Sequence, residues 1–221
     1  MYALNLENKK GLVFGVANRR SIAWAIAEKL NQAGSRMAFG YQGERLRSSV
    51  EKLTACCREP LLLDCDVTEE EQLDALFATL EESFGNLDFV VHGVAFAPRE
   101  TFDQPFYQVT RSQWTTAMDV SAYSLVAIAR RAQRLMLKGG SITTLTYLAS
   151  QRVVPKYNMM GVAKAALEAS VRFLAYDLGG RGIRVNAISA GPLRTVAAKS
   201  IPGFGRMFSK AAGASMLRRN I

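Results

Sequence analysis

Short apolar runs alternate with longer amphipathic segments along the chain, and this alternation constrains the fold more than any other feature. Strands are expected at 11–16, 37–41, 61–65, 87–94, 141–146 and 183–189, and the first of them is of the buried type. Helices are expected at 21–32, from a Thr68–Glu71 capping box to about 84, over most of 112–137, and from 157 to about 178. Repeated strand–helix units predict one α/β domain, residues 1–221, with a doubly wound parallel sheet in a three-layer α/β/α arrangement.

Composition excludes several kinds of site. The three cysteines, Cys56, Cys57 and Cys65, lack a metal-binding spacing and are interpreted as free thiols. His92 is the only histidine, which excludes a multi-histidine metal site and disfavours a histidine-based triad. We therefore expect no metal. No apolar run reaches the length of a membrane span and the N-terminus does not resemble a signal peptide, so a cytoplasmic protein is expected.

The net charge of +9 permits an acidic partner. The basic residues are spread along the chain, however, and no nucleic-acid-binding signature accompanies them. We expect no nucleic acid and no membrane as partner. An acidic carrier protein is the more useful hypothesis, with generic surface charge as the alternative.

The first strand–helix turn, Gly15 to Ile22, has the position of a phosphate-binding turn in a Rossmann fold. Its sequence is not G-x-G-x-x-G, and Arg19 and Ser21 stand where a short-chain dehydrogenase has its later glycines. Ser21 is able to cap the helix and to offer a hydroxyl and a backbone N–H to a pyrophosphate. An ordinary helix cap is the equal alternative. Ligands of such sheets lie beyond the carboxyl ends of the strands, where six residues fall: Gly15, Gln42, Asp66, Val94, Tyr147 and Gly191.

The segment after the second strand bears on the choice of dinucleotide. Gln42 is able to bond a ribose or an adenine edge, whereas Arg45 and Arg47 are able to reach a 2′-phosphate. Asp66, after the third strand, is able to accept from an adenine amino group, or else begins the next helix. These residues leave the choice between NADH and NADPH as cofactor open.

Tyr157 and Lys164 carry the most specific chemical hypothesis. Seven residues on a helix place both on one face, roughly 10 Å apart along the axis. A cation near a phenol favours phenolate and lowers the cost of proton donation. Gly161 lies between them and is expected to leave the backbone bare for a ligand. The same spacing also arises by chance on amphipathic helices. Tyr147, ten residues upstream of Tyr157, adds a second phenol.

These residues together resemble the short-chain dehydrogenase/reductase superfamily and, more closely, the bacterial enoyl-acyl-carrier-protein reductases. The resemblance covers essentially the whole chain and rests on 15–18, 21–24, 65–67, 96–98, Tyr147, Tyr157, Lys164 and 184–195. Thr144 stands where a ketoacyl reductase has its serine, and Tyr147 holds the enoyl-reductase position. The asparagine expected in the central helix is missing from 117–124.

The resemblance implies NADH- or NADPH-dependent reduction of a trans-2-enoyl thioester in fatty-acid synthesis. Tyr157 is then a hydrogen-bond donor to the thioester oxygen, Lys164 holds the nicotinamide ribose, and Tyr147 and Ala97 contact substrate. The implied dinucleotide contacts are Gly15, Ser21, Ile22, Gln42, Asp66, Val67, Val94, Lys164, Leu193, Arg194, Thr195, Val196 and Ala197.

The resemblance also implies a flexible substrate-binding loop at about 195–214. In it, Ile201, Phe204, Met207 and Phe208 suit a lipid-facing lid, with core packing as the alternative, and Lys199, Arg206 and Lys210 are placed to steer an acyl-carrier protein. A full-length family member is expected to be a homotetramer, and this chain is expected to lack the last helix and strand of the family. Two alternatives stay open: a 3-ketoacyl thioester reductase, and a truncated, catalytically silent nucleotide-binding protein.

Overall fold

A single six-stranded parallel sheet forms the centre of the computed structural model, which describes residues 5–199 and 201–220. The strands lie in the order β3-β2-β1-β4-β5-β6, so the sheet grows outward from β1 in both directions. Their bounds are β1 Lys10–Phe14, β2 Arg36–Tyr41, β3 Leu61–Asp64, β4 Phe89–His92, β5 Gly140–Thr146 and β6 Ile183–Ser189. The predicted doubly wound parallel sheet is confirmed.

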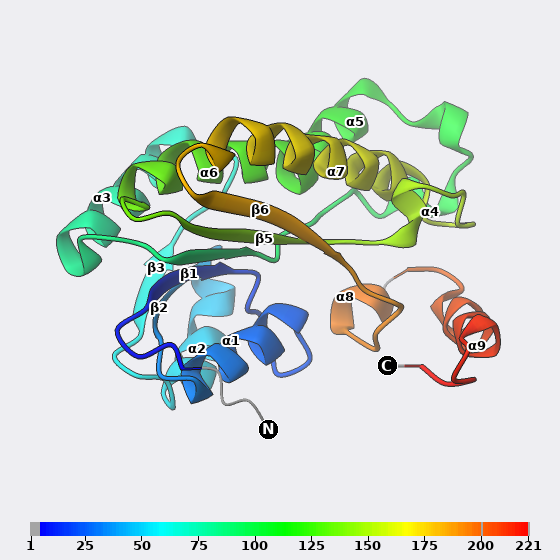
Figure 1. Ribbon diagram of the computed structural model, residues 1–221. Coiled ribbons are helices and arrows are strands. Elements are labelled where there is room, and N and C mark those ends of the chain that lie inside the picture. Colours follow the sequence, from blue (N-terminus) through cyan, green and yellow to red (C-terminus); the bar gives the residue numbers. More distant parts are fainter. Residues whose placement is uncertain (1–4, 200, 221) are drawn as a thin grey trace.

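Helices connect these strands and surround the sheet (Figure 1). The α-helices are α1 Ile22–Gln32, α2 Glu44–Thr54, α3 Glu70–Phe84, α4 Glu100–Asp103, α5 Arg111–Met118, α6 Ser124–Leu135, α7 Asn158–Gly179, α8 Val196–Lys199 and α9 Phe204–Ala214. Two 3₁₀ turns, η1 Phe106–Gln108 and η3 Leu148–Ser150, and one π turn, η2 Asp119–Tyr123, complete them. Within the described residues, no helix combines the length and apolar character needed to cross a membrane.

Two clusters of buried side chains lie on opposite faces of the sheet. Alternate residues of a strand point to opposite faces, and along β1 Leu12 and Phe14 belong to one cluster while Val13 belongs to the other. The first cluster packs the sheet against α3, α6 and α7, and the second packs it against α1 and α2. Burying each large apolar side chain contributes about 1.5–3 kcal/mol, so both faces stabilise the fold.

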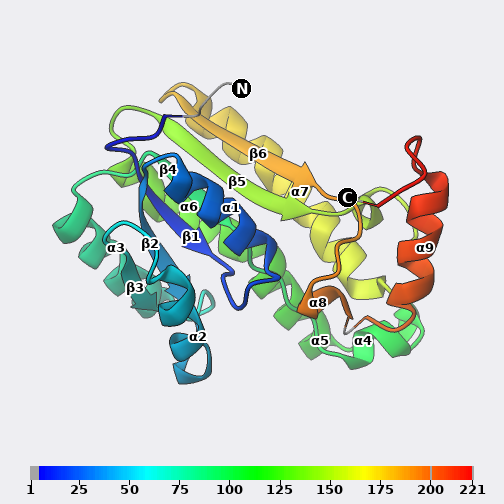
Figure 2. The same ribbon diagram turned by 90° about the horizontal axis from the view of Figure 1, so that it is seen from below.

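The helix layer beside α1 and α2 does not extend over the last two strands. Figure 2 shows β5 and β6 with α7 behind them and no described helix in front. The second buried cluster accordingly includes residues of β1, β2 and β4 but none of β5 or β6, and Ile188 on β6 is 47% exposed. The three-layer arrangement therefore holds over the first part of the sheet.

Several local predictions differ from the structure. The helix α2 is missing from the prediction because its sequence is strongly polar, with only Val50 and Thr54 buried. The Thr68–Glu71 capping box does not form: α3 begins at Glu70, and the Thr68 hydroxyl donates to Asp66 Oδ1 instead. The predicted central helix is largely helical, but a π turn interrupts it at Asp119–Tyr123. Strands β1 and β4 end two residues earlier than predicted, at the point where the two strands separate from each other.

Candidate active site

A cleft opens where β1 and β4 separate, at the carboxyl ends of the strands. The two strands pair as far as Phe14 and His92, and each is followed by a glycine. Gly15 has φ +94°, and a Cβ on it would lie 2.2 Å from the carbonyl oxygen of Gly93. A Cβ on Gly93 would lie 2.6 Å from the carbonyl oxygen of Phe14. Only glycine at both positions lets the two chains pass this closely and leave bare backbone at the cleft floor.

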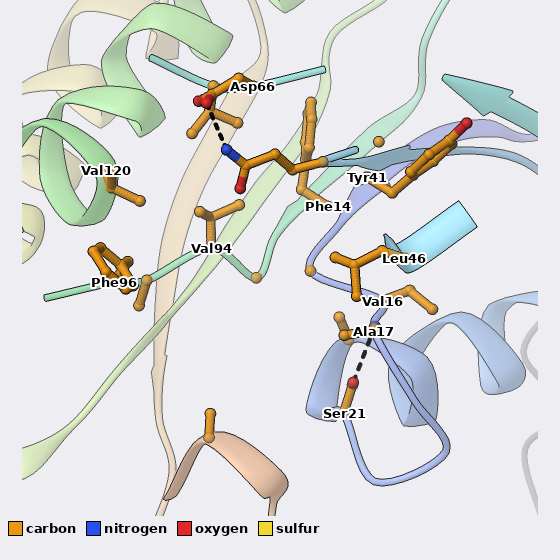
Figure 3. Close-up of a pocket in the computed structure, with 18 of the residues that line it drawn as sticks. Phe14, Val16, Ala17, Ser21, Tyr41, Leu46, Asp66, Val94, Phe96 and Val120 are labelled. Carbon is orange, nitrogen blue, oxygen red and sulfur yellow. Dashed lines mark hydrogen bonds between the residues drawn. The ribbon is translucent and has the colours of Figure 1, made fainter. Parts of the chain in front are cut away.

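The cleft has a volume of about 850 Å³ and holds most of the predicted dinucleotide contacts (Figure 3). A doubly wound sheet binds ligands at such a point, where the strand order reverses direction. Predicted residues that line it are Gly15, Ser21, Ile22, Gln42, Asp66, Val67, Val94, Thr195, Val196 and Ala197.

Ser21 fixes the first turn rather than capping the helix with its side chain. Its hydroxyl accepts from the backbone N–H groups of Ala17 (3.2 Å) and Asn18 (3.1 Å), and its own N–H donates to the Asn18 carbonyl oxygen. Ser21 is the N-cap residue of α1, as predicted, but its hydroxyl accepts no bond from the helix and its N–H is taken by Asn18, so the prediction that this N–H is offered to a ligand is wrong. Because the hydroxyl accepts both bonds, its proton is still available for a ligand at the N-terminus of α1.

Gln42 and Asp66 are tied to each other across the cleft wall. The Gln42 amide donates to Asp66 Oδ2 at 2.5 Å, and Figure 3 shows this contact. Asp66 Oδ1 accepts from the backbone N–H of Thr68 (2.9 Å) and from its hydroxyl (2.7 Å). One oxygen of Asp66 therefore organises the approach to α3 and the other is bonded to Gln42 at the cleft, while the contact with an adenine amino group stays a prediction.

The two arginines near the cleft have different environments. Arg47 pairs with Glu51 (3.0 Å) and with Glu44 (3.6 Å) along α2. Arg45 lines the cleft, and within the described residues it joins no salt bridge. Of the two, Arg45 is the one placed to meet a 2′-phosphate.

A second cavity of about 410 Å³ adjoins the cleft and contains the three predicted catalytic side chains. Tyr147, Tyr157 and Lys164 all line it, together with Ala97 and Leu193 from the predicted contacts. The ring centroids of Tyr147 and Tyr157 are 5.0 Å apart, with planes inclined by 58°. Residues shared by both cavities form a common wall: Ile22, Gly93, Val94, Ala95, Phe96, Leu145, Thr195 and Ala197.

Burial keeps the Tyr157 phenol protonated. Tyr157 is the N-cap of α7, and desolvation followed by the nearby Tyr147 raises its pKa to about 12. Desolvation also raises the pKa of Tyr147. The expectation that a neighbouring cation would favour phenolate at Tyr157 is therefore wrong, because desolvation outweighs any such effect. A phenol that stays protonated at neutral pH is suited to donate a hydrogen bond.

Lys164 is a buried cation, only 5% exposed, on α7. Its ammonium donates to the carbonyl oxygen of Leu145 at 2.7 Å, and Leu145 belongs to the common wall. Desolvation lowers the Lys164 pKa to about 8, although the negative charge of Glu168 opposes this effect. Lys164 is therefore mostly charged at neutral pH and retains two further N–H donors.

Gly161 serves helix packing rather than ligand access. A Cβ on Gly161 would lie 3.0 Å from the carbonyl oxygen of Ala149 in η3. The bare backbone predicted there faces the chain itself, so the prediction of a ligand approach is wrong. Close packing of α7 on η3 instead brings the Tyr147 segment against the helix that carries Lys164.

The segment 195–214 forms two short helices, α8 and α9, beyond the carboxyl ends of β5 and β6 (Figure 1). Phe204 is buried, and Ile201, Phe204 and Met207 line the second cavity. The Tyr147 hydroxyl contacts Met207 Sδ at 3.3 Å. Arg194 lines neither cavity, and its guanidinium lies 4.5 Å from the ring centroid of Phe208.

Ser121 was not predicted, although it shapes the common wall. Its hydroxyl accepts from the backbone N–H of Phe96 at 2.8 Å and donates to the carbonyl oxygen of Phe96 at 2.7 Å. Ser121 lies in the π turn of 119–123, a structure that is frequent at functional sites. The only sign of Ser121 in the sequence was the absence of the expected asparagine from the central helix. That absence pointed to this region but not to Ser121 itself.

His92 stands below the cleft as a neutral bridge between three elements. Its Nδ1 lies 2.8 Å from Thr144 Oγ1 on β5, and its Nε2 lies 2.8 Å from Ser124 Oγ on α6. Since Ser124 donates to the Val120 carbonyl oxygen, it accepts from Nε2–H, and Nδ1 then accepts from Thr144. Burial lowers the His92 pKa to about 3. Among the described residues, no cluster of His, Cys, Asp and Glu is arranged to hold a metal ion.

Comparison with known proteins agrees with this geometry. A family profile described as Enoyl-(Acyl carrier protein) reductase matches residues 15–221. The chain belongs to the enoyl-acyl-carrier-protein reductase family. The reductase is 50% identical over 199 residues to enoyl-acyl-carrier-protein reductase (NADH) 1 of Rhizobium meliloti, which covers 90% of this chain and 73% of that protein.

Two further comparisons concern Bacillus cereus. Its NADH-dependent enoyl-acyl-carrier-protein reductase is 49% identical over 216 residues, which is 97% of this chain and 84% of the relative. A crystal structure of the Bacillus cereus reductase with NADP+ and an indole naphthyridinone superposes with a TM-score of 0.94 at 48% identity, covering 97% of this chain and 84% of that one. The predicted family, fold and class of oxidoreductase are confirmed.

Proposed function

We propose that this reductase converts trans-2-enoyl thioesters to saturated acyl thioesters with NADH as the preferred cofactor, in fatty-acid synthesis. The observation that carries this proposal is the meeting of Tyr147, Tyr157 and Lys164 in one cavity that shares a wall with the dinucleotide-sized cleft. Two phenols and an ammonium there can each donate a hydrogen bond, which suits charge that develops on a substrate oxygen.

The cleft residues fit a dinucleotide. Gly15 and Gly93 line the cleft with backbone that carries no side chain, and Ser21 holds the turn at the N-terminus of α1, where an anion is favoured. Gln42 and Asp66 offer an amide and a carboxylate at the other end of the cleft. When bound, the nicotinamide cofactor supplies a hydride to the β-carbon of the enoyl thioester, and the α-carbon of the resulting enolate is then protonated to give the saturated product.

Tyr157 acts as the oxyanion donor. As the β-carbon is reduced, negative charge develops on the thioester oxygen, and the protonated Tyr157 hydroxyl donates a hydrogen bond to it. The raised pKa of Tyr157, about 12, means that this proton stays on the phenol at neutral pH. Removing one such donor in other enzymes costs about 10²–10³-fold in kcat, which sets the expected contribution.

Lys164 and Tyr147 position the reactants. Lys164 is anchored by the Leu145 carbonyl oxygen and directs its remaining N–H donors to the cofactor ribose. Tyr147 and Ala97 line the acyl pocket, and the lid residues Phe204 and Met207 exclude water from it. A dry pocket strengthens each hydrogen bond to the developing charge.

An acyl-carrier protein is the proposed bearer of the enoyl chain, and the proposed location is the cytoplasm. Lys199, Arg206 and Lys210 are exposed on and beside α8 and α9, next to the acyl pocket, where they attract an acidic partner. A homotetramer is proposed, supported by Phe173 (72% exposed) and Tyr176 (86% exposed) on α7. We propose no nucleic-acid or membrane partner.

The deciding experiment follows NADH oxidation by absorbance with crotonyl thioester as substrate and with 3-ketoacyl thioester as the comparator. We expect faster turnover of the enoyl compound. Faster turnover of the ketoacyl compound would instead identify a ketoacyl reductase. NADH binding without turnover on either thioester would identify a silent nucleotide-binding protein.

A further inference from the structure

Glu168 lies outside the proposed set of reacting groups, yet its carboxylate joins the segments that carry them. Glu168 is on α7, one turn beyond Lys164. Its Oε1 accepts from the Thr146 hydroxyl at 2.7 Å and from the Ser150 hydroxyl at 2.6 Å. Thr146 ends β5 directly before Tyr147, and Ser150 ends η3 directly after it. One oxygen therefore holds both ends of the Tyr147 segment against α7, the helix whose N-cap is Tyr157.

We propose that Glu168 is a positioning residue of the reductase, which fixes the Tyr147 segment against α7 and supplies the counter-charge that keeps Lys164 protonated. The inference rests on the proposed function for the roles of Tyr147 and Lys164. It adds a residue that touches neither substrate nor cofactor and acts through these two side chains.

The positioning role follows from short, charge-assisted hydrogen bonds. Bonds of 2.6–2.7 Å from hydroxyl groups to a carboxylate are the strong kind, and Glu168 makes two of them with a single oxygen. The Gln151 side chain adds a third contact to Glu168 from the end of η3. Gly161 contributes to the same packing of η3 on α7, because its missing side chain lets Ala149 approach the helix closely. Together these contacts set the 5.0 Å separation of the Tyr147 and Tyr157 rings.

The electrostatic role follows from the surroundings of Lys164. Glu168 is the acidic group whose charge acts on Lys164, while His92 on β4 is neutral and both tyrosines stay protonated. Burial disfavours the charged ammonium, so a nearby carboxylate is needed to retain the proton near neutral pH.

Charged groups on the other elements packed against α7 do not replace Glu168. Asp119 on η2 interacts electrostatically with Asp66 and Glu70. Arg131 on α6 forms salt bridges with Asp74 and Glu70. Arg184 on β6 is exposed to solvent, and Arg172, the next turn of α7, is an exposed partner of Glu168 itself.

Four variants separate the two roles. E168Q keeps an acceptor oxygen for both hydroxyls and removes the charge, whereas T146V and S150A keep the charge and remove one hydroxyl each. E168A removes the charge and both hydroxyl contacts together. D177N is the matched control, because Asp177 is an exposed carboxylate nine residues further along the same helix.

The first measurement is the affinity for NADH as a function of pH, by fluorescence titration without substrate. For E168Q we expect the loss of affinity at high pH to begin roughly one pH unit lower than in the wild type, because Lys164 loses its counter-charge. D177N, T146V and S150A should keep the wild-type pH limit. A merely structural role of Glu168 would not move this limit, and an E168Q limit equal to that of D177N would overturn the inference.

The second measurement is kcat and KM for crotonyl thioester at pH 7, with the melting temperature as a check on folding. T146V and S150A should lower kcat by about 10-fold at unchanged NADH affinity, because Tyr147 loses its fixed orientation. Wild-type kcat in both variants would likewise overturn the inference. If E168A does not fold, E168Q and the hydroxyl variants still decide. A wild-type chain that binds NADH without turnover would reject the proposed function, and the pH arm would still test Glu168.

Discussion

The Tyr147 and Tyr157 rings lie 5.0 Å apart at 58° although ten residues separate them in the chain. The strand end at Thr146 and the helix start at Asn158 bring them together, with η3 packed against α7 between them. Both phenols have raised pKa values because burial disfavours their charged forms. The pair therefore offers two neutral donors in one cavity, and their separate contributions can be measured.

Tyr157→Phe should lower kcat by about 10²–10³-fold with crotonyl thioester, because it removes the hydrogen bond to the developing oxyanion. NADH affinity, measured by fluorescence titration, should not change, since the phenol acts on the substrate oxygen. Tyr107→Phe, which changes a phenol that is 85% exposed and lines neither cavity, is the control. An unchanged kcat in Tyr157→Phe would remove the assigned role.

NADH affinity should fall as pH rises through about 8, which is the pKa of Lys164. The lysine carries its charge below this pKa and loses it above, so the ribose contact is strongest on the acidic side. Lys164→Ala should bind NADH more weakly at neutral pH and should show no step near pH 8. Lys138→Ala, at an exposed lysine, should retain the step. The same step in Lys164→Ala would show that another group titrates.

Gly15→Ala should destabilise the fold by about 1–3 kcal/mol and abolish NADH binding, because the new methyl group meets the Gly93 carbonyl and the backbone has φ +94°. Gly43→Ala separates the two causes: its φ is +73°, but no atom lies within 4 Å of the added Cβ. It should show the conformational strain alone. Gly179→Ala should be neutral. Chemical denaturation and NADH titration measure both effects.

His92 should remain neutral from pH 5 to pH 9 in the folded protein, because burial lowers its pKa to about 3. As the only histidine of the chain, it gives the nitrogen-15 NMR signals of a single imidazole ring. We expect the Nε2–H tautomer, with Nε2 donating to Ser124. Titration of this signal near pH 6.5 would contradict the buried network.

Arg45→Ala should lower kcat/KM for NADPH by about 10-fold and leave the value for NADH nearly unchanged, because a hydrogen bond to a charged group contributes about 1.5–3 kcal/mol. Arg47→Ala is the matched control, since Arg47 is engaged by Glu44 and Glu51. The wild type should favour NADH. Equal losses with both cofactors in Arg45→Ala would place this side chain away from the 2′ position.

Hydrophobic periodicity was sufficient to predict the strands of the sheet, but it did not predict the helix α2 or the start of α3. Strands β1, β2 and β4 are largely apolar runs that are buried on both faces of the sheet, so the run itself carries the signal. The helix α2 escaped prediction although Leu46, Val50 and Leu53 recur at helical spacing and pack on the second buried cluster, because the residues between them are polar and most of the helix faces solvent. The start of α3 was predicted wrongly for another reason. A capping-box pattern in the sequence does not specify whether the Thr68 hydroxyl bonds to the helix or to Asp66.

The sequence alone was enough to predict the parallel sheet and the family, and to choose Tyr147, Tyr157 and Lys164 as candidate catalytic residues. Strand periodicity and motif spacing are local properties of the chain. Only the tertiary structure decided how those groups behave. Burial, which raises the pKa of Tyr157 and lowers that of Lys164, depends on every element that packs around α7. The contact of Glu168 with Thr146 and Ser150, and that of Ser121 with Phe96, join distant segments whose spacing carries no periodic signal.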